Sequence, residues 1–404
     1  MSKPIKPPLS LPEFVALFSL TTSLTALSID AMLPALRDIG QALAVTGAND
    51  TQLVVTLFIL GMVFGEIFFG PISDAIGRKR AILAGLALFA FGAVVAMTAG
   101  TLEQLLAGRI IQGIGCAGPK IASRALIRDQ YEGRAMARLM SFIAMVFILV
   151  PMLAPALGQL VLAVADWRAI FLVFLALAAV NALWLGLRQP ETLEPARRIR
   201  FSLPNLLANG LLILRHAKVM AYTIALGFLF GALLVYVSTA PAMFFDLYGI
   251  DESFPLYFAI NALGLGVASY LNSQLVMRYG MHRLSVLALA GLVIFAGALL
   301  AVAAAYGGVP PFGAFMTLCF LAFCCNGVLF ANVNAMAMQS LGRVAGLGAS
   351  MIASLSSLVA VFISVVLGRF YDMTLFPLAG GLLLAGVVAL ALVLAADRNL
   401  AADV

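Results

Sequence analysis

Long uninterrupted runs of apolar residues fill most of this chain, and short polar stretches separate one run from the next. A helix that crosses a bilayer needs roughly 20 mainly apolar residues, whereas the strands of a membrane barrel alternate apolar and polar residues. The runs do not alternate, so the pattern predicts an all-α membrane protein with twelve transmembrane helices. The predicted spans lie near residues 11–36, 50–72, 81–100, 102–126, 135–164, 168–187, 219–245, 253–277, 283–305, 311–337, 344–370 and 373–396.

The composition indicates a lipid environment. Hydrophobic residues make up 63 % of the chain and charged residues 10 %, and the mean hydropathy is +1.08. These values lie far outside those of soluble globular domains, so we expect the lipid bilayer to be a partner of this chain. The first apolar run is too long for a cleaved signal peptide and lacks a small-residue cleavage site, so we interpret it as the first helix.

The basic residues predict the orientation of the helices. Of the 24 lysines and arginines, nineteen fall at the termini or in loops that would share one side of the membrane. Only Arg37, Arg168 and Arg369 fall on the other side. Cytoplasmic loops are enriched in Lys and Arg, so both termini are expected in the cytoplasm. The same distribution accounts for the net charge of +6 without a nucleic-acid partner.

A faint internal repeat divides the chain in two. Gly77 recurs as Gly280 and Arg80 recurs as Arg283, each 203 residues further along. Parallel repeats of this kind build transporters whose halves rock about a central binding site. The predicted parts are an N-terminal six-helix half at 1–187, a basic cytoplasmic linker at 188–218 and a C-terminal six-helix half at 219–404, the two halves being pseudo-symmetric.

Four charged residues fall inside predicted spans: Asp30, Glu66, Arg109 and Lys120. A charge in the bilayer costs about 2.5–3.5 kcal/mol on insertion scales, so each is a candidate functional residue. With a rise of about 1.5 Å per residue, Asp30 and Arg109 lie about 9–10 Å from the outer ends of their helices. Glu66 and Lys120 lie about 9 Å from the inner ends. The depths predict two acid–base couples.

Each couple has two interpretations. Asp30 is either a residue at the end of its helix or a proton-carrying carboxyl group, balanced between burial and a nearby arginine. Arg109 either tunes that carboxyl group or forms a structural ion pair between two helices. Glu66 and Lys120 form either a static ion pair or a second site of proton coupling.

The loop at residues 70–80 predicts a gate. Asp74, Gly77, Arg78 and Asp129 lie at the inner ends of neighbouring helices. Ion pairs that form in only one conformation would bias a two-state equilibrium. The alternative is that the arginines anchor this loop at the lipid surface.

Polar and aromatic residues of the C-terminal half complete the candidate substrate cavity. Amide and aromatic side chains suit amphipathic organic ligands, although each residue is also compatible with helix packing. The cavity candidates are Asp30, Arg109, Gln112, Lys120, Tyr236, Tyr257, Asn261 and Asn332.

Several stretches together resemble the bicyclomycin/chloramphenicol resistance (Bcr/CflA) branch of drug–proton antiporters of the major facilitator superfamily. The stretches are 28–36, 70–80, 109–115, 151–158, 236–241, 259–264 and 342–346, the last reading Gly342-Arg343-Val-Ala-Gly346. In the chain, Glu66 stands where glutamine is usual in that branch, and Lys120 stands where a small residue is usual.

The resemblance implies a proton-coupled exporter of small amphipathic molecules in a bacterial inner membrane, acting as a monomer. Asp30 and Arg109, with Glu66 as a further candidate, would couple transport to protons, and no cofactor beyond the proton gradient is expected. The alternatives are a transporter of a sugar or other metabolite, and a membrane receptor or scaffold. An enzyme or ATP-driven pump is not expected, because the chain has no phosphate-binding loop and no catalytic cluster. No metal site is expected.

Overall fold

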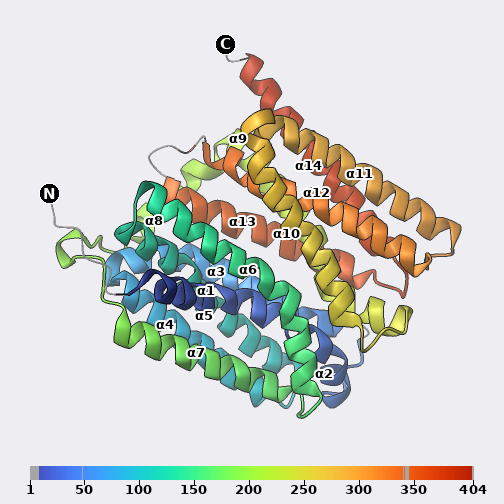
Figure 1. Cartoon of the computed structure of the whole chain (residues 1–404), viewed down its shortest axis with the longest axis horizontal. Helices are drawn as coiled ribbons and strands as arrows, with labels where there is room; N and C mark the ends of the chain where they lie inside the picture. The colour runs from blue at the N-terminus through green and yellow to red at the C-terminus, as the bar shows by residue number, and fades with distance from the viewer. Residues whose placement is uncertain (1–8, 48, 340, 342–344, 403–404) are drawn as a thin grey trace. The chain divides into compact units, whose positions relative to one another are not determined.

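The computed structural model describes residues 9–47, 49–339, 341 and 345–402, and within them it is built from helices without any strand. The all-α prediction is confirmed. The chain divides into two compact units, the first made of Met1–Thr46 and Leu57–Leu207 and the second of Gly47–Thr56 and Ala208–Val404. Each unit is a bundle of long helices that lie side by side (Figure 1).

The helices follow one another with short connections. The helices of the chain up to residue 214 are α1 (Leu11–Asp30), α2 (Leu36–Ala42), α3 (Leu53–Ile76), α4 (Arg78–Met97), α5 (Leu102–Gln130), α6 (Gly133–Leu162), α7 (Arg168–Arg188) and α8 (Leu203–Leu214). Those that follow are α9 (Ala217–Pro241), α10 (Phe254–Tyr279), α11 (Met281–Ala305), α12 (Phe312–Gln339), α13 (Ala345–Arg369) and α14 (Phe376–Ala402).

Eleven segments of the described chain are long and apolar enough to cross a membrane. Helix α5 is not among them, because it carries Arg109, Gln112 and Lys120 among its apolar residues. Its 29 residues extend about 43 Å at 1.5 Å per residue, which is more than the bilayer core requires. With α5, the structure contains the twelve spanning helices that the hydrophobic pattern predicts.

The predicted first span, 11–36, is not a single helix. Helix α1 ends at Asp30, and a 3₁₀ turn at Leu33–Ala35 leads into α2. Pro34 is the cause, because it has no N–H to donate to the carbonyl of Asp30 four residues earlier. The break places Asp30 at the C-terminal end of a helix inside the apolar stretch.

The two repeated glycines adopt matching backbone conformations. Gly77 separates α3 from α4 with φ 110° and ψ 154°, and Gly280 separates α10 from α11 with φ 78° and ψ 155°. Both φ values are positive, and residues with a side chain rarely adopt them. A single glycine therefore forms each of these sharp helix–helix corners.

Helix α5 packs against α3 on one side and α4 on the other. A Cβ atom on Gly113 would lie 2.0 Å from the carbonyl oxygen of Phe58 in α3. A Cβ atom on Gly115 would lie 2.2 Å from the amide nitrogen of Phe89 in α4. Small residues at membrane helix interfaces allow backbones to approach this closely. The glycines thus set the position of α5, which carries two of the four intramembrane charges.

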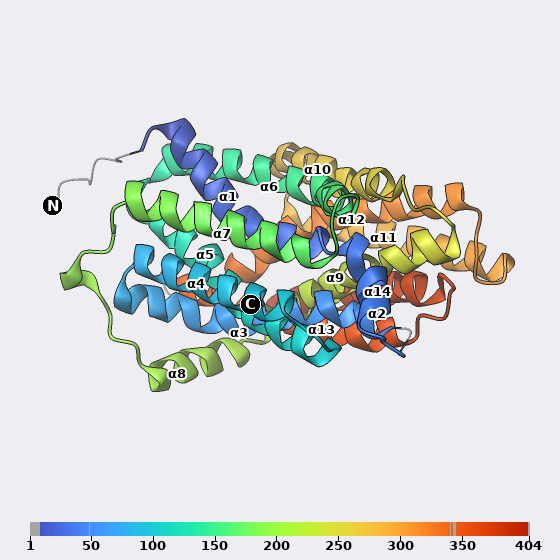
Figure 2. The same ribbon diagram turned by 90° about the horizontal axis from the view of Figure 1, so that it is seen from below.

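The segment predicted as a linker includes an ordered helix, α8, that exposes apolar side chains. Figure 2 shows the extended connection that leaves α7 and reaches α8. In α8, the exposed residues Leu203, Leu207, Leu211 and Leu214 lie three or four positions apart, so they share one face of the helix. Ile213 is buried at 1 % exposure.

In the second unit, α9 packs against α12, α13 and α14, and α11 packs against α12 and α14. Aromatic rings fill the space around one end of α12. Phe315 packs on the rings of Phe244 and Tyr248, with centroid distances of 5.8 and 5.5 Å. A π-helical turn at Ala242–Leu247, which directly follows Pro241, holds Phe244 in this cluster.

Candidate functional site

Asp30 is the last residue of α1 and is buried, with 6 % of its surface exposed. Among the described residues its carboxylate makes no hydrogen bond or ion pair. Asp30 is thus an ionisable group inside an apolar stretch, and a charged residue at such a position is a functional candidate.

Arg109 of α5 is fully buried. It lies close to Asp30, because it contacts the backbone two residues earlier in α1. Its Nη2 donates to the backbone carbonyl of Ser28, at 2.8 Å, and its Nη1 donates to Oε1 of Gln112, at 2.5 Å. The guanidinium also lies 4.4 Å from the ring centroid of Phe58. The carbonyls in the last turn of a helix have no partner within that helix. Arg109 therefore stabilises the end of α1.

The structure thus brings Asp30 and Arg109 near each other, but without a direct contact between their charged groups. Both residues lie at the break after α1, but Arg109 contacts the backbone two residues before Asp30 and not its carboxylate. Gln112, predicted as a cavity residue, is a buried partner of the guanidinium. Its own Nε2 is buried without a hydrogen bond to any described residue, so this donor is unused within the described part of the chain.

Glu66 and Lys120 form the second predicted couple directly. The Nζ atom of Lys120 lies 2.6 Å from Oε1 of Glu66, and the side chains are 25 % and 0 % exposed. Nζ also lies 3.7 Å from the sulfur of Met62. Within the described structure, the second carboxylate oxygen of Glu66 is buried without a partner. Lys120 is the one ionic partner found for this fully buried acid among the described residues, so the acid depends on it.

We predict that Lys120→Met lowers the free energy of unfolding by about 3–5 kcal/mol, because removal of one partner of a buried ion pair leaves an uncompensated charge. The double variant Glu66→Gln/Lys120→Met should recover most of that loss. Thermal unfolding of the purified variants in detergent checks this. An unchanged unfolding midpoint for Lys120→Met would contradict this dependence.

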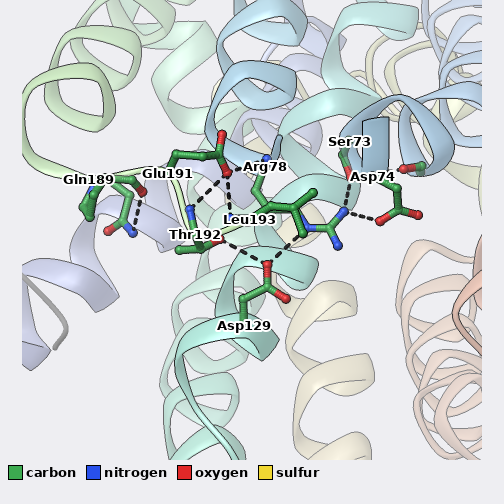
Figure 3. Close-up of polar contacts among 10 residues, drawn as sticks. Ser73, Asp74, Arg78, Asp129, Gln189, Glu191, Thr192 and Leu193 are labelled. Carbon is green, nitrogen blue, oxygen red and sulfur yellow. Dashed lines mark hydrogen bonds and ion pairs between the residues drawn. The ribbon is translucent and has the colours of Figure 1, made fainter. Parts of the chain in front are cut away.

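The predicted gate residues meet at one point (Figure 3). Arg78 donates from Nη1 to Asp74 and to the hydroxyl of Ser73, the latter at 2.8 Å. Its Nε donates to Oδ2 of Asp129 at 3.2 Å. The guanidinium therefore joins the end of α3 to the end of α5 across the corner formed by Gly77.

Two residues of this cluster had not been expected from the sequence: Glu191 and Thr192, in the chain after α7. Oε1 of Glu191 accepts from the backbone N–H of Arg78 at 2.8 Å, which places a carboxylate at the N-terminus of α4, where the helix dipole favours it. Thr192 donates to Oδ2 of Asp129 at 3.1 Å. The signal available in the sequence was an acid in a mainly basic segment, where Glu194 is the other acid.

Gly77 makes room for this contact. A Cβ atom there would lie 2.3 Å from a carboxylate oxygen of Glu191. The glycine is thus required both for its positive φ and for the approach of the acid.

The Arg343 motif at 342–346 lies largely outside the described residues.

The polar candidates of the second unit lie mainly between helices. Tyr236 in α9 is 1 % exposed, and its hydroxyl oxygen accepts from Nδ2 of Asn261 in α10 at 2.9 Å. Oδ1 of Asn261 is buried without a partner. Asn332 in α12 exchanges two hydrogen bonds of 2.9 Å with Asn272 in α10, which the sequence had not singled out.

Tyr257 belongs to a different group. Its ring packs edge-on against Phe312, at 4.8 Å between centroids, and parallel to Phe244 at 6.3 Å. It is a partly exposed member of the aromatic cluster beside α12. Of the four second-unit candidates, only Tyr236 and Asn261 are joined to each other by a hydrogen bond.

Comparison with known protein families matches residues 18–362 to the Major Facilitator Superfamily. A bicyclomycin resistance protein homolog of Haemophilus influenzae is 31 % identical over 278 residues, which are 69 % of this chain and 70 % of the relative. Multidrug resistance protein D of Escherichia coli is 31 % identical over 225 residues, or 53 % of this chain and 57 % of the relative.

Among solved structures, the xylose transporter XylE from E. coli is similar with a TM-score of 0.73. The match covers 95 % of this chain and 96 % of that transporter, at 14 % sequence identity. At this identity the likeness concerns the fold alone.

Proposed function

Because this chain belongs to the Major Facilitator Superfamily and is therefore a membrane transporter and not an enzyme, we propose that it exports small amphipathic organic molecules in exchange for protons. Two relatives carry names that refer to drug resistance, which supports drug efflux as the physiological role. The relatives are bacterial, which supports the inner membrane as the location. We further propose that both termini lie in the cytoplasm and that the protein acts as a monomer.

The observation that carries proton coupling is the site of Asp30. This acid is buried at the end of α1, makes no ion pair among the described residues, and lies two residues from the carbonyl that Arg109 holds. Protonation would remove a charge there and so change the electrostatic field at the break in the helix. Coupling follows if substrate and proton compete for this region, with Arg109 as a positioning residue.

Proton release from the purified, detergent-solubilised protein tests this proposal. A panel of amphipathic antibiotics and of sugars is added to weakly buffered protein, and the change in pH is recorded. We expect antibiotics to displace protons. Release in response to sugars alone, or proton movement in the same direction as substrate in vesicles, would instead support a proton-coupled sugar or metabolite transporter.

We propose that the Arg78 cluster is the cytoplasmic gate. Arg78→Gln should lower the exchange rate in proteoliposomes roughly 10- to 100-fold, because hydrogen bonds between charged groups contribute about 1.5–3 kcal/mol each. Arg80→Gln is the matched control, since Arg80 is an exposed residue of the same charge two positions further along α4. Equal losses in the two variants would contradict a gate and favour general anchoring of the loop to lipid.

A further inference from the structure

An apolar groove of about 560 Å³ lies in the first unit and is lined by alanine, serine, valine and leucine side chains. Helix α1 forms its floor and contributes Ser19, Ser23 and Leu27, while α6 and α7 form the walls, with residues that include Leu157 and Leu177. Both ribbon views show α1 between α6 and α7 (Figures 1 and 2). The volume falls in the range of sites that hold drug-sized ligands.

Two serines that line this groove carry hydroxyl groups without a hydrogen-bond partner among the described residues. Ser19 and Ser23 are 3 % and 8 % exposed, and the Oγ atoms of both are buried and unpaired within the described structure. Neighbouring hydroxyls on α1 behave differently, because Thr21 and Thr22 donate to backbone carbonyls one turn earlier, at 2.7 and 2.9 Å. A buried polar group without a partner is costly, so a ligand that supplies an acceptor would be stabilised here.

The depth of the two serines distinguishes between possible occupants. They lie 8 and 12 residues after Leu11, which is about 12 and 18 Å along a helix of about 30 Å. This is the middle of the bilayer core, whose thickness is about 30 Å. A phospholipid offers only methylene groups at this depth, because its ester carbonyls lie at the interface. The hydroxyls therefore fit a mainly apolar molecule that carries its own hydrogen-bond acceptor.

We propose that this groove is a membrane-side binding site for apolar molecules that carry a carbonyl or similar acceptor, with Ser19 and Ser23 as the donors. This inference rests on the proposed function, because it identifies the cargo class as one that partitions into lipid. Leu27 is the lining residue of α1 nearest to Asp30 in the chain, and Asp30 follows it by three residues. Residues three apart on a helix are neighbours, so a bound molecule would lie one turn from the proposed proton carrier.

Fluorescence titration of the full-length protein in detergent tests the site with two probes. Nile red is apolar and has a ring carbonyl, whereas pyrene has no acceptor. Ser19→Ala/Ser23→Ala should raise the Kd for Nile red about 5- to 20-fold, because each neutral hydrogen bond contributes a few-fold to roughly tenfold, and should leave the Kd for pyrene unchanged. Thr22→Val, which removes a hydroxyl already bonded to the backbone, should change neither.

Two results would overturn the proposal. An unchanged Nile red Kd in the serine double variant would show that the hydroxyls bind no ligand. An equal rise for both probes would show that the groove holds hydrocarbon alone, as an acyl chain would. Ser19→Thr/Ser23→Thr, which keeps both hydroxyls, should bind Nile red within about twofold of the wild type. Binding is measured without a proton gradient, so failure of coupling at Asp30 would leave this test intact.

Discussion

Asp30→Asn is expected to lower pH-gradient-driven transport at least about 100-fold. Asparagine has nearly the same shape as aspartic acid but cannot exchange a proton, so the coupling step is lost while the packing at the break in α1 is kept. The neutral amide also imitates the protonated carboxyl, and substrate binding should therefore survive. Uptake of an antibiotic into inverted vesicles with an imposed pH gradient measures the loss, and proton release on substrate addition should disappear with it.

The matched control for this variant is Asp38→Asn. Asp38 is an exposed acid of the neighbouring helix α2, so the same substitution there should leave transport within about twofold of the wild type. Undiminished transport by Asp30→Asn would refute the assignment of this residue. The buried carboxylate of Glu66 would then be the next candidate for proton coupling.

Gly113→Val is expected to destabilise the protein by about 2–4 kcal/mol or to prevent its folding, because overpacking of a tight interface forces backbone shifts. A Cβ atom at this position would lie 2.0 Å from the carbonyl oxygen of Phe58 and 2.9 Å from the amide nitrogen of Met62. Both contacts are backbone atoms of α3, which cannot move aside as a flexible side chain can. The yield of folded monodisperse protein and its thermal unfolding midpoint in detergent measure the effect.

Gly186→Val provides the control for the close approach. Gly186 is also a helical glycine, in α7, but a Cβ atom there would meet nothing within 4 Å. We expect nearly wild-type yield and stability for that variant. If Gly113→Val were equally harmless, α5 could shift against α3 at low cost, and the position of Arg109 would not depend on this contact.

The hydrophobic pattern predicted the number and approximate limits of the spanning helices, because both depend on the length and composition of local segments. It did not predict the interruption inside the span at residues 11–36, where Pro34 ends the first helix. The signal was visible in the sequence, but proline is tolerated inside many membrane helices. Pro151 and Pro155 lie within the continuous helix α6, so the presence of a proline alone does not predict a break.

Depth along each helix predicted which charges could meet, with mixed results. Glu66 and Lys120 form an ion pair, whereas Arg109 contacts the carbonyl of Ser28 near Asp30. Depth sets the level of a residue in the bilayer but not the direction in which its side chain points. A largely apolar helix has no polar face to reveal its rotation, so the partner of a buried charge depends on helix packing.

The sequence by itself determined an all-helical membrane protein, its twelve spans and the glycine corners, because burial in lipid and backbone sterics act on local residues. The tertiary structure decided the contacts between distant segments. It placed Glu191 at the start of α4, Arg109 at the end of α1, and two unpaired serines on the floor of a groove. These contacts depend on the rotation and spacing of helices, which close glycine packing sets and hydrophobic periodicity does not encode.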